Sequence, residues 1–149
     1  MTAMRNTAIR VFLAILAVSS VQLGVWATFW PHQFYRTFPG GGRTWVAVNG
    51  PYNEHLVRDF GGLNLAIALL LVVAVVTMGS TMVRTAAAGY LVFGIPHLVY
   101  HLRHLDVFSS TDKVVNAVIL SLAVLMALGA LLLSLPTEER ARARAVQPA

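Results

Sequence analysis

Residues 65–76 read Leu-Ala-Ile-Ala-Leu-Leu-Leu-Val-Val-Ala-Val-Val and hold no polar side chain. A membrane-spanning α-helix needs about 20 mostly apolar residues, and this run lies within a longer apolar segment, 62–79. Three further segments meet the same requirement, at 9–30, 82–101 and 114–135. The sequence therefore predicts an all-α, polytopic integral membrane protein, a single domain over 1–149 in which four transmembrane helices form an antiparallel bundle.

The composition supports a membrane protein over a soluble one. Of the 149 residues, 57% are hydrophobic and 11% are charged, whereas soluble domains average about 45–50% and about 25%. The mean hydropathy is +0.69. The net charge of +5 comes from eleven basic residues scattered over loops and ends, without the basic stripe of a nucleic-acid-binding surface. The chain has no cysteine, which excludes disulfides and thiolate chemistry.

The first apolar segment has two interpretations. Arg5 and Arg10 followed by an apolar stretch are typical of a signal peptide. However, the stretch is long and ends in Trp26, Phe29 and Trp30, which is typical of aromatic residues at a membrane interface. We therefore expect an uncleaved transmembrane helix.

Basic residues in the loops predict the orientation, because they are more frequent on the cytoplasmic side. With the N-terminus inside, six basic residues face the cytoplasm and five face outward. This favours a multi-pass protein of the cell membrane with both termini and the tail, 136–149, in the cytoplasm. The inner set is Arg5, Arg10, Arg84, Arg140, Arg142 and Arg144, and the outer set is Arg36, Arg43, Arg58, Arg103 and Lys113.

The outer loop between the first two helices, 31–61, is long for a connection without a role of its own. Near its end, Pro51 suits the first turn of a helix, and Gly61-Gly62 suits a break. A short interfacial helix is therefore predicted before the second transmembrane helix. In that helix two favourable side-chain pairs form at a spacing of four residues, Glu54 with Arg58 and His55 with Asp59. These pairs either contribute to a site or only anchor the loop.

Small residues recur every four positions on the first helix, at Ser20, Gly24 and Thr28. In lipid, such residues allow two helix backbones to approach closely. We expect the stripe to pack within the protein rather than to form a dimer interface.

All five histidines fall on the outer side of this topology, and three of them lie between Pro96 and Asp106. At the helical spacing, His97, His101 and His104 fall within an arc of about 60°, and Tyr90 shares that face. Asn64 and Asn116 lie at a similar depth on neighbouring helices, which suggests a small polar chamber. The candidate ligand-binding residues are His97, His101, Tyr90, Asn64, Asn116, Glu54, His55, Arg58 and Asp59.

Three uses of the histidines stay open. They bind a lipid headgroup or small ligand, they bind a metal ion, or they serve the structure alone at the membrane interface. A His pair four residues apart can bind one metal, and the candidate ligands are His97, His101, His104 and Glu54. No other cofactor is predicted.

The four short helices with a long first outer loop resemble the DoxX-like group of small bacterial membrane proteins. The run from Gly50 to Gly62 is similar to a motif of uncharacterised four-helix membrane proteins from GC-rich bacteria. The resemblance implies the fold class and a bacterial source, and it carries no activity or residue role.

The sequence favours a non-enzymatic membrane protein whose outer face binds a lipid headgroup, a small ligand or a membrane partner. Four arginines would contact anionic groups: Arg36, Arg43, Arg58 and Arg103. One alternative is a metal- or quinone-dependent redox or lipid-modifying enzyme that uses the histidines. The other is an accessory subunit that docks into a larger complex through its polar loop.

Overall fold

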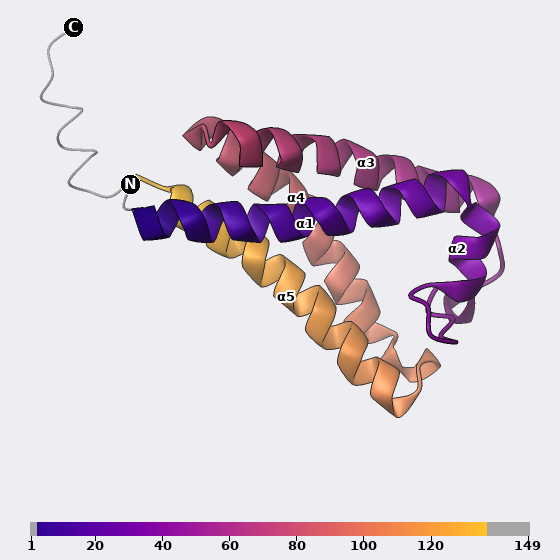
Figure 1. Ribbon diagram of the computed structural model, residues 1–149. Helices are drawn as coiled ribbons and strands as arrows, with labels where there is room; N and C mark the ends of the chain where they lie inside the picture. The colour runs from indigo at the N-terminus through magenta and orange to yellow at the C-terminus, as the bar shows by residue number, and fades with distance from the viewer. Residues whose placement is uncertain (1–2, 137–149) are drawn as a thin grey trace, which may run out of the picture.

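The computed structural model of the protein describes residues 3–136 (Figure 1). The predicted tail from 137 onward, with Arg140, Arg142 and Arg144, lies outside the described residues. Within them the chain forms five α-helices and two short 3-10 turns. These elements are α1 (Ala3–Phe29), α2 (Pro31–Thr37), η1 (Ala47–Asn49), α3 (Glu54–Thr77), α4 (Ser80–Arg103), η2 (Leu105–Val107) and α5 (Ser110–Ser134).

Four of the helices, α1, α3, α4 and α5, are long and apolar enough to cross a membrane. They have 24 to 27 residues each, which is about 36–40 Å at a rise of ~1.5 Å per residue. That length exceeds the ~30 Å hydrocarbon core of a bilayer. The prediction of an all-α protein with four such helices is confirmed.

The predicted break at Gly61-Gly62 is wrong, because α3 runs without interruption from Glu54 to Thr77. The helix begins at Asn53, whose side-chain oxygen accepts a hydrogen bond from Leu56 N at 3.1 Å and so satisfies a free N–H of the first turn. A glycine costs a helix only about 1 kcal/mol, too little to end one this long. The segment predicted as loop to residue 61 therefore includes α2 and two turns of α3.

Small residues bring α1 and α3 close together, and the two helices run side by side (Figure 1). A Cβ atom added at Gly24 would lie 2.8–2.9 Å from atoms of Leu65, and one added at Gly61 would meet Thr28. Ser20 and Gly24 are buried. The stripe on α1 therefore packs within the protein, as the sequence predicts.

The other two long helices, α4 and α5, form a second pair that diverges from the first (Figure 1). The two pairs converge near the N-terminus and separate toward the end that carries α2. At the convergent end, Arg84 Nε and Nη2 donate to the carbonyl oxygen of Ser134 at 3.2 and 2.6 Å. Arg5 Nη2 donates to the carbonyl oxygen of Leu135 at 2.9 Å. These three bonds satisfy two carbonyl groups that the end of α5 leaves free.

The hydrophobic core follows this shape. The larger cluster of buried side chains joins all four long helices, from the middle of the molecule to the end where the two pairs converge. A second cluster, at the separated end, joins α1, α2 and α3 through aromatic rings that include Trp26, Phe34 and Phe60. The larger cluster consists of Ile9, Leu13, Leu16, Ala17, Ile67, Leu71, Ala74, Val83, Ala86, Ala87, Ala127 and Ala130.

The segment 38–53 reaches from α2 toward the start of α5. Gly40, Gly41 and Gly42 all have positive φ, at 104°, 62° and 79°, which glycine adopts without strain. The turn that they form is closed by Trp45 N, which donates to the carbonyl oxygen of Phe38 at 2.8 Å. This segment meets the connection between α4 and α5 where Trp45 contacts Phe108, and the first turn of α5 where Arg43 pairs with Asp112.

Candidate functional site

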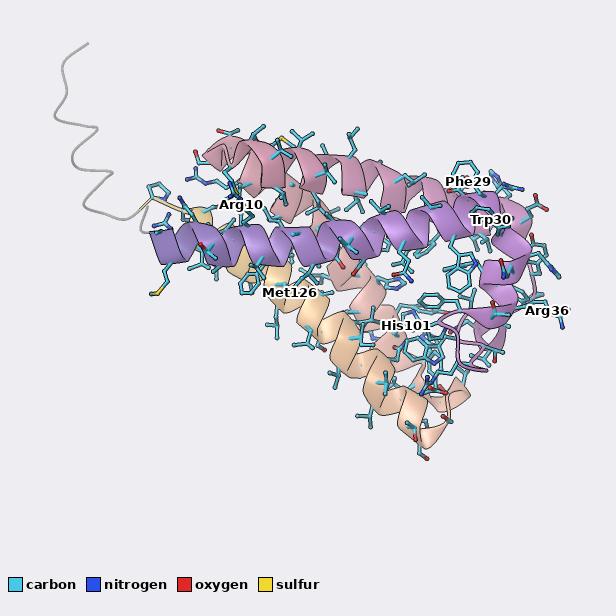
Figure 2. The ribbon with its side chains drawn as sticks, viewed as in Figure 1. Arg10, Phe29, Trp30, Arg36, His101 and Met126 are labelled. Carbon is cyan, nitrogen blue, oxygen red and sulfur yellow. The ribbon has the colours of Figure 1, made fainter. Side chains whose placement is uncertain are left out.

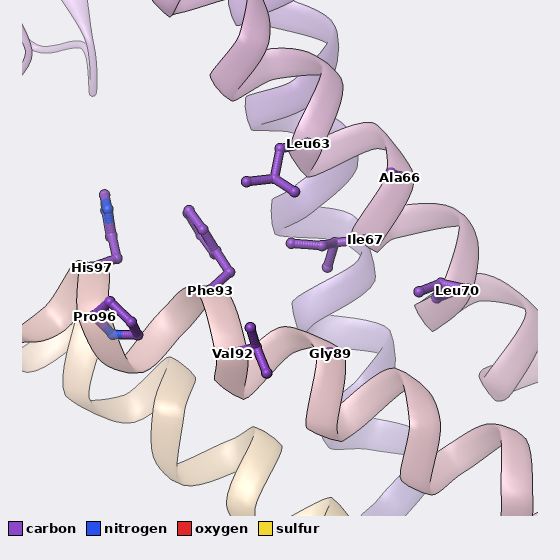
Figure 3. A pocket seen from close by; sticks show the side chains of 9 residues that line it. All are labelled: Leu63, Ala66, Ile67, Leu70, Gly89, Val92, Phe93, Pro96 and His97. Carbon is purple, nitrogen blue, oxygen red and sulfur yellow. The ribbon is translucent and has the colours of Figure 1, made fainter.

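An open groove of about 570 Å³ lies between α3 and α4 (Figure 3), within the ~300–1,000 Å³ range of small-molecule sites. His97 is the only polar side chain among its nine lining residues, and it lies at the end nearest the α4 C-terminus. The other lining residues are Leu63, Ala66, Ile67, Leu70, Gly89, Val92, Phe93 and Pro96.

The groove follows from residue spacing on the two helices. Residues three and four apart share one helix face, which places the α3 lining residues 63, 66, 67 and 70 in one row. Gly89 leaves room opposite this row: a Cβ atom added there would meet only Leu70 Cδ1, at 4.0 Å. A side chain at position 89 would therefore fill the groove without meeting a backbone.

His97 is half-buried between aromatic rings. Its imidazole stacks on Phe93 at 5.1 Å and on Phe60 at 6.2 Å between ring centroids. Pro96 lies inside α4 and has no N–H, so the helix makes one hydrogen bond fewer just before His97. The rings from α3 and α4 hold the imidazole at the end of the groove.

His101 lies beside His97, as the spacing of four residues predicts. The two ring centroids are 4.6 Å apart, and His101 also stacks on Phe108 at 6.0 Å. Phe108 in turn meets Trp45 at 6.2 Å. His101 Nδ1 is buried and has no hydrogen-bond partner within residues 3–136.

The two predicted asparagines are both buried, with exposed fractions of 2% for Asn64 and 3% for Asn116. Asn64 Nδ2 donates to the carbonyl oxygen of Phe60 at 2.9 Å, one turn earlier in α3. Asn116 Oδ1 has no partner in the described part of the chain. Tyr90 packs against the larger core and the edge of Gly94. Asn116 therefore keeps a free acceptor, whereas Tyr90 contributes to packing.

The charged residues at the start of α3 do not turn toward the histidines. His55 Nε2 lies 3.2 Å from Asp59 Oδ2, and the His55 side chain is 86% exposed. Arg58 Nε lies 2.9 Å from Glu54 Oε1, and Arg58 Nη1 also donates to the carbonyl oxygen of Thr28. These four side chains form the two helical pairs that the sequence predicts, and Arg58 anchors α3 to α1.

Tyr52 lies just before these pairs. Its ring meets His32 at 5.2 Å and Tyr35 at 5.2 Å. Partial burial and the neighbouring Glu54 carboxylate raise the pKa of Tyr52 above its usual 10.0. The phenol serves the packing of the loop, where its ring contacts His32 and Tyr35.

The predicted metal ligands are not assembled. His104 follows the end of α4, and its Nδ1 lies 2.7 Å from the carbonyl oxygen of Tyr100. The imidazole also stacks on the Tyr100 ring, with 4.2 Å between the ring centroids. Glu54 is paired with Arg58, away from the histidines. Over residues 3–136, no three His, Cys, Asp or Glu side chains converge as a metal site requires. His97 and His101 remain together without a third ligand.

Sequence reasoning missed the contribution of the loop beyond α2. Arg43 Nε forms an ion pair with Asp112 Oδ1 at 2.7 Å, which ties the loop to the first turn of α5. Trp45 and Phe108 are buried, at 7% exposed each. The sequence does show one aromatic residue in each of two polar connections, Trp45 before α3 and Phe108 before α5. It does not indicate that these two residues meet.

Figure 2 shows His101 among rings at the separated end of the molecule, with Arg36 on its outer side. Arg36 and Arg103 form no ion pair within the described residues.

Comparisons of the chain with protein-family models, with curated proteins and with solved structures find no match. The similarity to DoxX-like proteins stays a prediction, and the function must be inferred from the groove and its surroundings.

Proposed function

We propose that this is a non-enzymatic, four-span protein of the cell membrane that binds an amphipathic lipid-class ligand. The apolar chain of the ligand lies in the groove between α3 and α4, and its polar head forms a hydrogen bond with His97. The observation that carries the proposal is the lining of the groove, which is apolar except for one imidazole at its end. Such a lining matches a molecule with one long apolar part and one polar end.

The surface of the long helices supports a membrane setting. Large apolar side chains on all four helices are exposed, for example Val18 at 69%, Val76 at 73%, Val92 at 77% and Leu125 at 59%. In water, an apolar surface of this extent would associate, whereas in a bilayer it meets lipid tails. The histidine end then faces outward if the N-terminus is cytoplasmic.

The hydrogen bond decides what binds. Lipid tails are as apolar as the groove lining, so transfer of a chain from bilayer to groove gives no hydrophobic gain. Shape and the imidazole must supply the preference. A hydrogen bond contributes about 0.5–1.5 kcal/mol net, which corresponds to roughly a two- to tenfold difference in affinity.

Filling the groove tests the proposal. Gly89→Leu places a side chain inside it, and Gly62→Leu is the matched control, because Gly62 is exposed on α3 and a Cβ atom there meets nothing within 4 Å. Full-length protein in detergent is loaded with 1-oleoylglycerol or with 1-oleoylglycerol 3-phosphate, and native mass spectrometry counts the retained molecules. We expect Gly89→Leu to retain neither probe and Gly62→Leu to retain what the unchanged protein retains. Equal retention by all three proteins would contradict the proposal.

The polar end has its own variant. His97→Phe preserves a ring against Phe60 and Phe93 but removes both ring nitrogens, so the groove keeps its shape and loses its hydrogen bond. Retention of the probe that the unchanged protein prefers should fall by about two- to tenfold. Retention unchanged in His97→Phe would show that the imidazole does not contact the head.

A further inference from the structure

We propose that the head of the bound molecule is uncharged and reaches past His97 to His101 and Asn116, beneath the segment 38–46. This inference rests on the proposed function, since it assigns the head of a ligand whose chain occupies the α3–α4 groove. It names the ligand class as a single-chain or prenyl-type lipid with a hydroxyl or amide head, which can donate a hydrogen bond. A phosphate or carboxylate head is excluded.

His97 and His101 mark a path from the groove to the outer end of α4. Their ring centroids are 4.6 Å apart, so a group bound to His97 lies within one helical turn of His101. His101 stacks on Phe108, and Phe108 meets Trp45. Phe108 and Trp45 therefore bound the far side of the two histidines, where the segment 38–46 meets the α4–α5 connection.

Asn116 lies at the depth of His101 on the neighbouring helix. A Cβ atom at Gly94 on α4 would be 3.5 Å from Val124 Cγ2 on α5, which fixes the register of these antiparallel helices. His101 is seven residues outward from Gly94, and Asn116 is eight residues outward from Val124. The two residues therefore differ in depth by about one helical rise, ~1.5 Å.

Buried atoms without partners favour a ligand at this place. His101 Nδ1 and Asn116 Oδ1 are both buried and make no hydrogen bond within residues 3–136. Asn116 is 3% exposed, so bulk water does not satisfy its side-chain oxygen. The Trp45 indole N–H lies toward the Asp112 carboxylate, with which it interacts. Buried polar atoms in proteins nearly always have a partner, because leaving one unpaired is costly. An O–H or amide N–H group supplies the donor that Asn116 Oδ1 lacks.

The charges around the path favour an uncharged head. Arg43 and Asp112 neutralise each other at 2.7 Å, and Arg58 is held by Glu54 and the Thr28 carbonyl. The remaining neighbours of the two histidines are aromatic rings. Three further cations at this end of the molecule, Arg36, Arg103 and Lys113, form no ion pair within residues 3–136, but none of them is buried. An anionic head at His101 would therefore have no buried counter-charge, which is unfavourable in an apolar environment.

The experiment compares two probes with the same chain. The heads of 1-oleoylglycerol and 1-oleoylglycerol 3-phosphate differ only by the phosphate, and retention of each by the full-length protein is measured by native mass spectrometry at pH 7.5. We expect the uncharged probe to be retained at least about tenfold better, a 1.4 kcal/mol preference. Asn116→Leu should reduce that preference, and Asn64→Leu should leave it unchanged, because Asn64 is paired within its own helix.

The outcomes separate the two proposals. Equal retention, or better retention of the phosphate probe, with loss of both probes in Gly89→Leu would overturn the uncharged head and leave the groove proposal standing. Retention of either probe that is insensitive to Gly89→Leu would overturn the proposed function itself. If Asn116→Leu does not fold, His101→Phe replaces it, since a phenyl ring keeps the stack on Phe108 and removes the free nitrogen. A preference unchanged in that variant also overturns the inference.

Discussion

At the scale of single residues, Gly61 and Gly62 are neighbours on α3 with different surroundings. A Cβ atom at Gly61 would overlap the backbone of α1 at Thr28, whereas one at Gly62 meets nothing within 4 Å. We expect Gly61→Ala to destabilise the protein by about 1–3 kcal/mol. Gly62→Ala should be neutral or stabilising, by up to about 1 kcal/mol. Thermal unfolding of both variants in one detergent, followed by tryptophan fluorescence, checks the pair. Equal shifts in Tm would contradict the close approach of α1 and α3.

The histidines show how far helical spacing predicts contacts. His97 and His101 are four residues apart and lie together, as the sequence predicts. His104 is predicted on the same face, but α4 ends at Arg103, and His104 takes φ −123° and ψ 36°. Its ring therefore turns back onto Tyr100. Spacing arguments hold only as far as the helix continues, and the exact helix end is not readable from this sequence.

At the scale of elements, the C-terminus of α5 depends on Arg84. Two of its guanidinium nitrogens donate to the Ser134 carbonyl oxygen, and a cation at this helix end is also favoured by the helix dipole. Arg84→Ala should lower the free energy of unfolding by about 1.5–3 kcal/mol. The control is Arg10→Ala, since Arg10 is exposed on α1. Denaturant titration in mixed micelles measures both, and similar losses in the two variants would contradict a specific role for Arg84.

The ion pair between Arg43 and Asp112 holds the loop against α5. Its partners are partly exposed, at 42% and 18% of their side chains, so we expect a weak but detectable coupling between them. Arg43→Ala and Asp112→Ala should each speed proteolysis of the loop, and the double variant should be no faster than the faster single one. Additive effects in this cycle would show that the two side chains act independently.

The sequence predicts elements better than their connections. The length of each apolar run predicts four long helices, and the pairs Glu54–Arg58 and His55–Asp59 predict helical structure before residue 62. The glycine pair predicts a break that α3 does not have. Gly61 instead allows the close approach of α3 to α1. In the loop, the roles of Trp45 and Arg43 depend on partners more than 60 positions away in the sequence, and hydrophobic periodicity carries no information on such pairs.

At the scale of the whole molecule, the separation of the two helix pairs could not be predicted. It depends on which small residues meet across helices and on the aromatic side chains at the separated end. The candidate site was predicted in part: His97 and His101 meet, whereas Glu54, His55, Arg58 and Asp59 satisfy one another on the surface of α3. In the sequence, the groove appears only as mostly apolar residues spaced three and four positions apart on two helices that face lipid. That spacing alone does not predict a groove.

The orientation in the membrane gives a prediction that the absence of cysteine makes simple to test. Single cysteines are introduced by Arg36→Cys in α2 and by Ser80→Cys at the α3–α4 turn, both exposed positions. In intact cells, a membrane-impermeant maleimide should label the variant at 36 and leave the variant at 80 unlabelled. Labelling of position 80 alone would show that the protein has the opposite orientation. Labelling of both positions would contradict a spanning arrangement.

The most direct test of the ligand groove is a map of where a lipid chain contacts the unchanged protein. A 1-monoacylglycerol with a mid-chain diazirine is incorporated into nanodiscs with the protein and photolysed, and labelled residues are identified by mass spectrometry. The groove predicts labels concentrated at Leu63, Leu70 and Val92 over apolar residues of matching exposure outside it, which are Val118, Leu128 and Val76 respectively. Labels spread evenly over all lipid-facing residues would contradict a chain bound between α3 and α4.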